Sequence, residues 1–149
     1  MEQSQKSIKS TKRKRNYEED REQTFFFNWL SCYPKIRELT FAIPNGGSRS
    51  RKEVINKYGK KIVISPEGRR LKGMGVTRGF LDVITLIPSK GYHAFLLEMK
   101  SNTGKLSPEQ AAFIERVEPL GYCCRVAKSW VEARSHLMEY LDKSWFNLM

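Results

Sequence analysis

Runs of apolar residues alternate along the chain with proline, glycine and charged residues, and they predict a series of short elements. Residues 17–30 begin with acidic side chains and continue into an aromatic and aliphatic run, which predicts a helix that Pro34 ends. Residues 82–87 are rich in β-branched side chains and predict a core strand. A turn at 88–91 leads to a partner strand at 92–99, so the two segments predict a hairpin.

The second half of the chain contains two clear helix starts. Residues 107–110 supply an N-cap serine, a proline at the first helical position and a capping-box glutamine. A Ser-x-x-Glu pattern caps a final helix over about 129–141. Strands are predicted at 40–43 and 122–126. The resulting order is helix, strand, hairpin, helix, strand, helix, with no internal repeat.

The stretch between residues 48 and 78 has a less regular pattern. It follows a Pro-Asn-Gly-Gly turn at 44–47, whose glycines allow backbone amides to approach a ligand closely. The pattern then predicts a helix near 52–58, a short strand at 62–64 and a new element beginning at Pro66.

Positive charge is concentrated in two segments. The chain has 149 residues, with 27 Lys and Arg against 16 Asp and Glu, which gives a net charge of +11. Residues 1–15 contain six bases and one acid, residues 49–78 contain ten bases and two acids, and the remainder is nearly neutral. Such segments favour a polyanionic partner, either nucleic acid or an anionic membrane. The charge therefore predicts a binding surface rather than general solubilisation.

Composition also limits the domain organisation and the location. With 40% apolar residues overall, residues 17–149 can form one packed domain, whereas residues 1–16 predict a basic disordered tail. The chain has no run of about 18 apolar residues and no secretory leader, so we expect a soluble intracellular protein of a prokaryote or a virus-infected host. The basic residues 12–15 leave nuclear import or a phosphate-contacting arm as alternatives to a solvated charge run.

The cysteines and histidines indicate no metal or redox site. The cysteines lack CxxC spacing, so we expect buried, reduced thiols rather than a disulfide framework or a zinc site. His93 and His136 are isolated and are expected to be structural or exposed. The three cysteines are Cys32, Cys123 and Cys124.

Two carboxylates and an amine are predicted to meet at the end of the hairpin. If the loop has five residues centred on Lys90, Asp82 lies directly across from Glu98, and Lys100 shares that face. A shift of one residue in the loop centre would separate them. The carboxylates and the Met99 carbonyl are hard ligands for a divalent cation. The lysine side chain can orient water, can deprotonate it as the neutral amine, or can stabilise a transition state as the ammonium.

The same residues belong to a series of motifs. Gly79-Phe80-Leu81-Asp82, followed sixteen residues after the aspartate by Glu98-Met99-Lys100, resembles the signature of PD-(D/E)XK nucleases. Three flanking blocks are similar to the virus-type replication-repair branch of that superfamily, the VRR-NUC domain: residues 44–47, 72–76 and 103–110. The resemblance covers about residues 17–141. It implies an α/β, restriction-endonuclease-like core with a central mixed β-sheet flanked by helices, in the order α-β-β-β-α-β with a C-terminal helix.

The sequence departs from that family in two places. Leu81 stands where a proline is expected, which is tolerable because that proline shapes the start of the strand without binding metal. The stretch between Gly47 and Lys72 is longer than in compact members and includes much of the basic segment. The path of DNA along this stretch is therefore left open.

The resemblance implies roles for individual residues. Asp82 and Glu98 are expected to bind Mg²⁺ or Mn²⁺, and Lys100 is expected to serve catalysis. Gln110 is expected to support the site, although the capping box alone also explains it. On the first helix Glu19 is expected to contribute to metal binding and catalysis, with Glu22 as the alternative acid. The residues expected to contact DNA are Asn45, Gly46, Gly47, Arg49, Arg51, Arg69, Arg70 and Lys72.

The motifs and the charge together predict a Mg²⁺- or Mn²⁺-dependent DNA endonuclease. By analogy with stand-alone members, which are small homodimers resembling junction-resolving nucleases, we expect a homodimer acting on branched DNA in repair, recombination or replication, with a Holliday junction or a flap as substrate. Residues 25–30 are more apolar than one buried helix face needs and could contribute to the dimer interface. We expect no membrane partner and no small-molecule cofactor. The alternative is a non-catalytic nucleic-acid-binding module on the same fold, and RNA cleavage is a third option.

Overall fold

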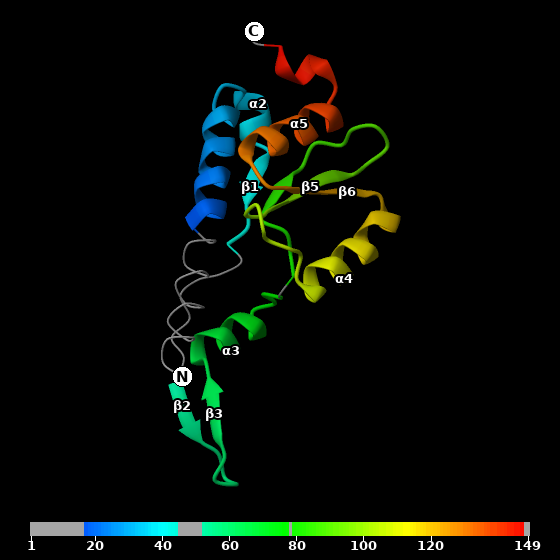
Figure 1. The fold of residues 1–149 in the computed structure, drawn as a ribbon. Coiled ribbons are helices and arrows are strands. Elements are labelled where there is room, and N and C mark those ends of the chain that lie inside the picture. The colour runs from blue at the N-terminus through cyan, green and yellow to red at the C-terminus, as the bar shows by residue number, and fades with distance from the viewer. Residues whose placement is uncertain (1–16, 45–51, 78, 148–149) are drawn as a thin grey trace.

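The computed structural model describes residues 17–44, 52–77 and 79–147 (Figure 1). Its helices are residues 17–30, α2 (Pro34–Arg37), α3 (Pro66–Gly73), α4 (Pro108–Val117) and α5 (Trp130–Tyr140), with 3-10 helices at Glu118–Leu120 and Lys143–Phe146. Its strands are β1 (Thr40–Ala42), β2 (Lys52–Ile55), β3 (Lys61–Ile64), β4 (Val83–Thr85), β5 (Ala94–Met99) and β6 (Tyr122–Ala127). No helix in these ranges has the length and apolar character needed to cross a membrane. The predicted tail, residues 1–16, lies outside the described residues.

A four-stranded mixed sheet forms the centre of the fold, in the order β1-β4-β5-β6. β4 pairs antiparallel with both β1 and β5, whereas β6 runs parallel to β5. The first helix and α5 pack on one face of this sheet, and α4 packs on the other (Figure 1). The predicted fold class, a central mixed sheet flanked by helices, is confirmed.

Strand β5 is buried along its whole length because helices cover both of its faces. Phe95 and Leu97 belong to the core formed with the first helix and α5, whereas Leu96 packs on the side of α4. Because successive side chains of a strand point to opposite faces, Glu98 lies on the same face as Leu96. A carboxylate is therefore placed inside an otherwise apolar strand, beneath α4.

The aromatic run on the first helix is covered mainly by the chain itself. Phe26 is fully buried, and Trp29 stacks on Phe146 of the C-terminal 3-10 helix with 6.1 Å between ring centroids. Tyr33 meets the same Phe146 ring edge-on at 5.3 Å. Phe25 is 45% exposed. Intramolecular packing thus explains most of the apolar surplus from which a dimer interface was predicted, and the homodimer stays a prediction.

The register of the central hairpin is the one predicted from the sequence, but the loop is not. Val83 pairs with Leu97, and continuing this register by one residue places Asp82 opposite Glu98, as predicted. The predicted five-residue loop is wrong, because Ser89 already pairs with Tyr92 across a tight turn. Three residues lie between Thr85, the last residue of β4, and Ser89. Only two lie between Tyr92 and Phe95, the β5 residue that pairs with Thr85. This extra residue acts as a bulge and restores the predicted register.

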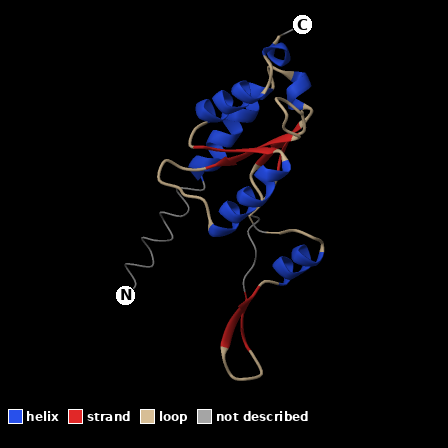
Figure 2. Cartoon of the chain, turned by 90° about the vertical axis from the view of Figure 1, so that its right-hand side faces the viewer, coloured by secondary structure: helices blue, strands red, loops and turns tan. Residues whose placement is uncertain are grey.

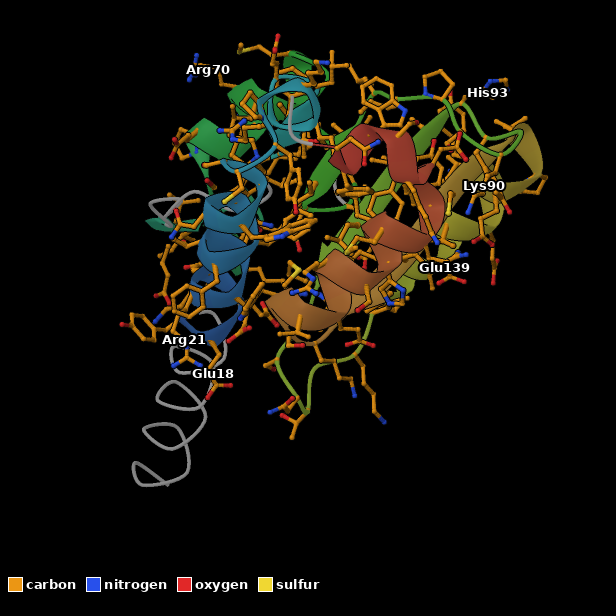
Figure 3. The ribbon with its side chains drawn as sticks, turned by 90° about the horizontal axis from the view of Figure 1, so that it is seen from above. Glu18, Arg21, Arg70, Lys90, His93 and Glu139 are labelled. Carbon is orange, nitrogen blue, oxygen red and sulfur yellow. The ribbon has the colours of Figure 1, made fainter. Side chains whose placement is uncertain are left out.

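The tight turn consists of Lys90 and Gly91, both with positive φ. A two-residue turn of this kind requires positive φ at both positions, which glycine adopts freely and lysine does not. The Lys90 ammonium donates a hydrogen bond to the Glu139 carbonyl near the end of α5, and Figure 3 shows the two residues side by side. A cation at this place satisfies a carbonyl of the last helical turn and compensates for the unfavourable backbone.

The helix predicted near residues 52–58 is wrong. Lys52–Ile55 is strand β2, which pairs antiparallel with β3 in a separate two-stranded sheet. The Asn56 carboxamide oxygen accepts hydrogen bonds from the backbone amides of Tyr58, at 3.0 Å, and Lys60, at 2.9 Å. These bonds, with Gly59 at a φ of +73°, close a hairpin turn, which the helical interpretation overlooked. The short strand predicted at 62–64 is confirmed.

The β2–β3 hairpin and α3 together form an extension, residues 52–77, which we call the arm. Figures 1 and 2 show the arm standing apart from the central sheet and its covering helices. α3 begins at Pro66 with Ser65 as its N-cap and buries none of its residues. The arm rejoins the fold through residues that lead directly into Asp82.

Smaller details differ from the sequence predictions. Pro34 begins α2 as well as following the end of the first helix. Cys123 and Cys124 are buried free thiols as predicted, but Cys32 is exposed because it lies in the turn after the first helix. Burial raises the pKa of the Cys124 thiol to about 12, so this thiol stays protonated at neutral pH.

Candidate active site

The structure brings Asp82 and Glu98 together at the end of the hairpin. Asp82 directly precedes β4, and its Oδ2 accepts a hydrogen bond from the Met99 backbone amide at 2.8 Å. Glu98 lies near the end of β5 and is only 2% exposed. The hydrogen bond ties the two strand ends together and keeps both carboxylates at one place.

The two oxygens of Glu98 have different surroundings. Oε1 lies 2.5 Å from the Lys100 ammonium and accepts a hydrogen bond from the Gln110 carboxamide at 2.5 Å. Oε2 is buried and receives no hydrogen bond from the described residues. A buried carboxylate oxygen without a donor is costly, because water would otherwise solvate it. Among the described residues, no hydrogen-bond donor or cation therefore stabilises negative charge at Oε2.

The surroundings of Glu98 also raise its pKa from 4.5 to about 7. Burial is the largest cause, and the nearby Asp82 carboxylate adds repulsion. Lys100 and Gln110 act in the opposite direction but do not outweigh these two effects. Without a further cation, the side chain is therefore about half protonated near neutral pH.

A divalent cation fits this arrangement chemically. Asp82 and Glu98 supply hard oxygen ligands, and Oε2 of Glu98 lacks a partner within the described ranges. No three His, Cys, Asp or Glu side chains of the described part of the chain form a group that could hold a metal ion. A cation here would therefore complete its coordination with backbone carbonyls, such as that of Met99, and with water, as Mg²⁺ commonly does.

The two candidate acids of the first helix have different contacts. Glu19 Oε1 accepts a hydrogen bond from the Ser101 backbone amide at 3.0 Å, one residue beyond Lys100. Glu22 Oε2 accepts one from the Trp130 amide at 2.9 Å, in the first turn of α5. Glu22 thus satisfies a free amide at a helix N-terminus, whereas Glu19 lies beside the site. The metal-ligand role of Glu19 stays a prediction.

Gln110 makes the contacts required by both of the roles that the sequence left as alternatives. Its Oε1 accepts the Ser107 backbone amide at 3.0 Å and completes the capping box of α4. Its Nε2 donates to Glu98 at the same time. A carboxamide has an acceptor and a donor at its two ends, so one side chain can cap the helix and hold the carboxylate.

Gly79 has a positional role that sequence reasoning did not find. Its φ is +89°, and a Cβ atom there would lie 2.7 Å from the Glu109 carbonyl oxygen at the start of α4. This close approach fixes the segment that leads into Asp82 against the helix that carries Gln110. Leu81, in the position where the family expects proline, is fully buried and packs with Leu96. The Gly-Phe-Leu-Asp motif itself was the available signal for this role.

Replacing Gly79 by Ala is expected to lower the free energy of unfolding by about 2 kcal/mol or more, because alanine meets both an unfavourable φ and a backbone clash. Any shift of Asp82 relative to Glu98 should also reduce activity. Urea denaturation measures the first effect. Gly75→Ala is the matched control, since Gly75 has a φ of +87° but an open Cβ position. Equal losses in the two variants would contradict the role of the close approach.

Three of the eight predicted DNA-contacting residues are among the described residues. Arg69, Arg70 and Lys72 are exposed on α3 in the arm, outside the carboxylate cluster. Figure 3 shows Arg70 at the periphery of the molecule. Asn45, Gly46, Gly47, Arg49 and Arg51 lie outside the described residues.

Comparisons with known proteins agree with this fold. The VRR-NUC domain matches residues 18–130 of the chain. A solved structure described as "VRR_NUC domain protein" superposes with a TM-score of 0.62 at 23% sequence identity, covering 85% of this chain and 88% of the other. At that identity the likeness establishes the fold. A search of curated proteins gives no match. The family resemblance found in the sequence is confirmed.

Proposed function

Because the chain belongs to the VRR-NUC domain family, we propose that it is a divalent-metal-dependent DNA endonuclease with Asp82, Glu98 and Lys100 at its catalytic centre. The observation that carries the proposal is the Glu98 carboxylate. One of its oxygens is held by Lys100 and Gln110, and the other is buried without a donor among the described residues, opposite Asp82. A group that only stabilised the fold would have no reason to leave this oxygen unsatisfied.

Each residue of the site has a distinct part in phosphodiester hydrolysis. Asp82, Glu98 and the Met99 carbonyl would hold Mg²⁺ or Mn²⁺, which when bound offsets charge on the phosphate and makes hydroxide available near neutral pH. Lys100 places an ammonium where it can orient the attacking water or stabilise negative charge in the transition state. Gln110 fixes Glu98 through Oε1 and leaves Oε2 for the cation.

The substrate in this proposal is branched DNA, such as a flap or a Holliday junction, processed in repair, recombination or replication. The arm supports DNA as the partner, because residues 52–77 carry seven Lys and Arg against two Glu, for a net charge of +5. A homodimer would present two active sites to the two strands of such a substrate.

The proposal is tested by incubating the full chain with labelled duplex, single-stranded, flapped and four-way DNA in Mg²⁺, Mn²⁺ or EDTA. We expect cleavage in the presence of either metal and none in EDTA, with flapped or four-way DNA cut fastest. If the chain binds DNA but every substrate stays intact with both metals, the nuclease proposal is wrong and the non-catalytic module is favoured. Cleavage of an RNA control alone would identify the third option.

Replacing Arg69, Arg70 and Lys72 together by glutamine is expected to weaken DNA binding. Each phosphate contact adds about one unit to the slope of log affinity against log salt concentration, so the triple variant should lower the magnitude of the slope by roughly 3 if all three side chains contact phosphates. Fluorescence anisotropy over a range of salt concentrations measures this slope.

The control variant replaces three exposed basic residues of other elements by glutamine: Lys35, Arg116 and Lys143. Its net charge equals that of the α3 variant, so nonspecific electrostatics change equally. An equal loss of slope in the two variants would contradict a localised DNA contact on α3.

A further inference from the structure

The most exposed large side chain of the described apolar and aromatic residues lies at the tip of the arm. Tyr58 is 80% exposed and sits in the turn between β2 and β3. A tyrosine ring on a projecting turn contributes nothing to a core, and exposing it costs solvation free energy. Its position therefore suggests a partner rather than a structural role.

The turn that carries Tyr58 is held by four hydrogen bonds of Asn56. The Asn56 side chain accepts from the amides of Tyr58 and Lys60. The Asn56 backbone amide donates to the Lys60 carbonyl at 2.9 Å, and the Asn56 carbonyl accepts from the Gly59 amide at 2.9 Å. The backbone beneath the ring is thus ordered before any partner binds. Such preorganisation lowers the entropy lost on binding.

The ring of Tyr58 has one lysine over it and two more close by in the sequence. The Lys57 ammonium lies 5.0 Å from the ring centroid, and Lys60 and Lys61 are exposed next along the chain. An aromatic face flanked by cations matches an unpaired nucleotide, because the base can stack on the ring while the phosphates meet the lysines. Paired bases inside a duplex are already stacked on each other and offer no such face.

The arm also connects this tip to the catalytic centre. A four-residue strand spans about 13 Å and an eight-residue helix about 12 Å, so placed end to end the two would span at most about 25 Å. That upper limit corresponds to roughly seven base pairs of duplex DNA. The exposed basic residues of α3 lie between the tip and Asp82 along the chain.

We propose that Tyr58 stacks on an unpaired base of branched DNA, and that the arm thereby selects substrates with unstacked nucleotides several base pairs from the cut. This inference rests on the proposed nuclease function for its substrate, but it concerns binding and not chemistry. The tip distinguishes unpaired from paired DNA, and the basic side chains of α3 supply affinity that does not depend on DNA structure.

The test measures DNA binding without cleavage. The Asp82→Asn variant of the full chain, in EDTA, is titrated with a flapped or gapped DNA and with a fully paired duplex. Adding Tyr58→Ala should weaken binding to the branched DNA about tenfold and change duplex binding less than twofold. Adding Tyr58→Phe, which keeps the ring, should retain the affinity. Equal losses on both DNAs, or no loss on either, would overturn the proposal.

A spectroscopic readout distinguishes stacking from a general loss of affinity. 2-Aminopurine is placed at the unpaired positions of the DNA, where stacking on an aromatic ring changes its fluorescence. Saturating protein should produce this change when residue 58 is tyrosine or carries the Tyr58→Phe substitution. The Tyr58→Ala variant should not produce it. A change that persists with Tyr58→Ala would overturn the assignment of stacking to this residue. Because neither measurement requires cleavage, failure of nuclease activity does not decide the outcome.

Two controls complete the design. Tyr17→Ala removes another exposed ring, 69% accessible on the first helix, and should leave both DNA affinities unchanged. Sedimentation with anionic phosphatidylserine vesicles tests the other partner that tyrosine and lysine can serve. If Tyr58→Ala abolishes vesicle binding while preserving branched-DNA affinity, the partner is a membrane and the proposal is wrong.

Discussion

The Asp82→Asn variant is expected to lose metal-dependent DNA cleavage by roughly 10³-fold while retaining its fold. Asparagine has nearly the same shape, and its carboxamide oxygen can still accept the Met99 amide hydrogen bond. It lacks the negative charge needed to hold a divalent cation beside Glu98. Initial rates on a flapped or four-way DNA, with saturating Mn²⁺ or Mg²⁺, measure the loss.

Binding and stability measurements separate this catalytic defect from unfolding. DNA affinity in EDTA should be unchanged or slightly increased, because the variant has one negative charge fewer. Asp142→Asn removes an exposed aspartate whose side chain makes no capping hydrogen bond, and it should keep full activity. Full cleavage by the Asp82 variant would show that this carboxylate does not take part in the chemistry. Equal losses in both variants would indicate a general effect of charge.

The cluster at the end of the hairpin was predictable because local patterns fix most of its geometry. The hairpin places Asp82 across from Glu98, and the capping box starts α4 at a defined residue, so Gln110 faces the strand end. The prediction of the register nevertheless depended on two compensating details. The actual turn shifts the pairing by one residue, and a bulge before it shifts the pairing back.

The arm was not predictable from local patterns to the same extent. Residues 52–55 form a strand only because a second segment, residues 61–64, pairs with them, and periodicity over so short a run does not distinguish helix from strand. The Glu19 and Glu22 alternatives also required tertiary contacts. Both acids lie on one helix, but one meets the end of β5 and the other the start of α5.

The pH dependence of stability provides an independent test of the Glu98 environment. In the folded protein this carboxyl has a pKa of about 7, whereas in the unfolded chain it has an ordinary value near 4.5. Between pH 4.5 and 7, the Glu98 carboxyl is mostly ionised in the unfolded chain and mostly protonated in the folded protein. The contribution of Glu98 to the free energy of unfolding is thus fully present below pH 4.5, and it is lost as the pH rises through 7.

The Glu98→Gln variant is expected to lack this pH dependence. Measured by urea unfolding in EDTA, the free energy of unfolding of the wild type relative to the variant should fall by about 3 kcal/mol between pH 4.5 and 8. Other carboxylates titrate in both proteins and cancel in the difference. The interaction with Lys100 lowers the pKa of Glu98, so it is already included in this expected fall. Parallel curves would mean that Glu98 has the same pKa in the folded and unfolded states.

Adding a divalent cation at pH 8 turns the same measurement into a test of the metal site. A cation that binds the ionised Glu98 carboxylate stabilises the folded state in proportion to its occupancy, so Mn²⁺ or Mg²⁺ should recover much of the stability lost on ionisation. The Glu98→Gln and Asp82→Asn variants should gain much less. The two carboxylates repel each other in the folded protein. Equal metal-induced gains in all three proteins would place the bound cation elsewhere and remove the physical reason for burying Glu98 opposite Asp82.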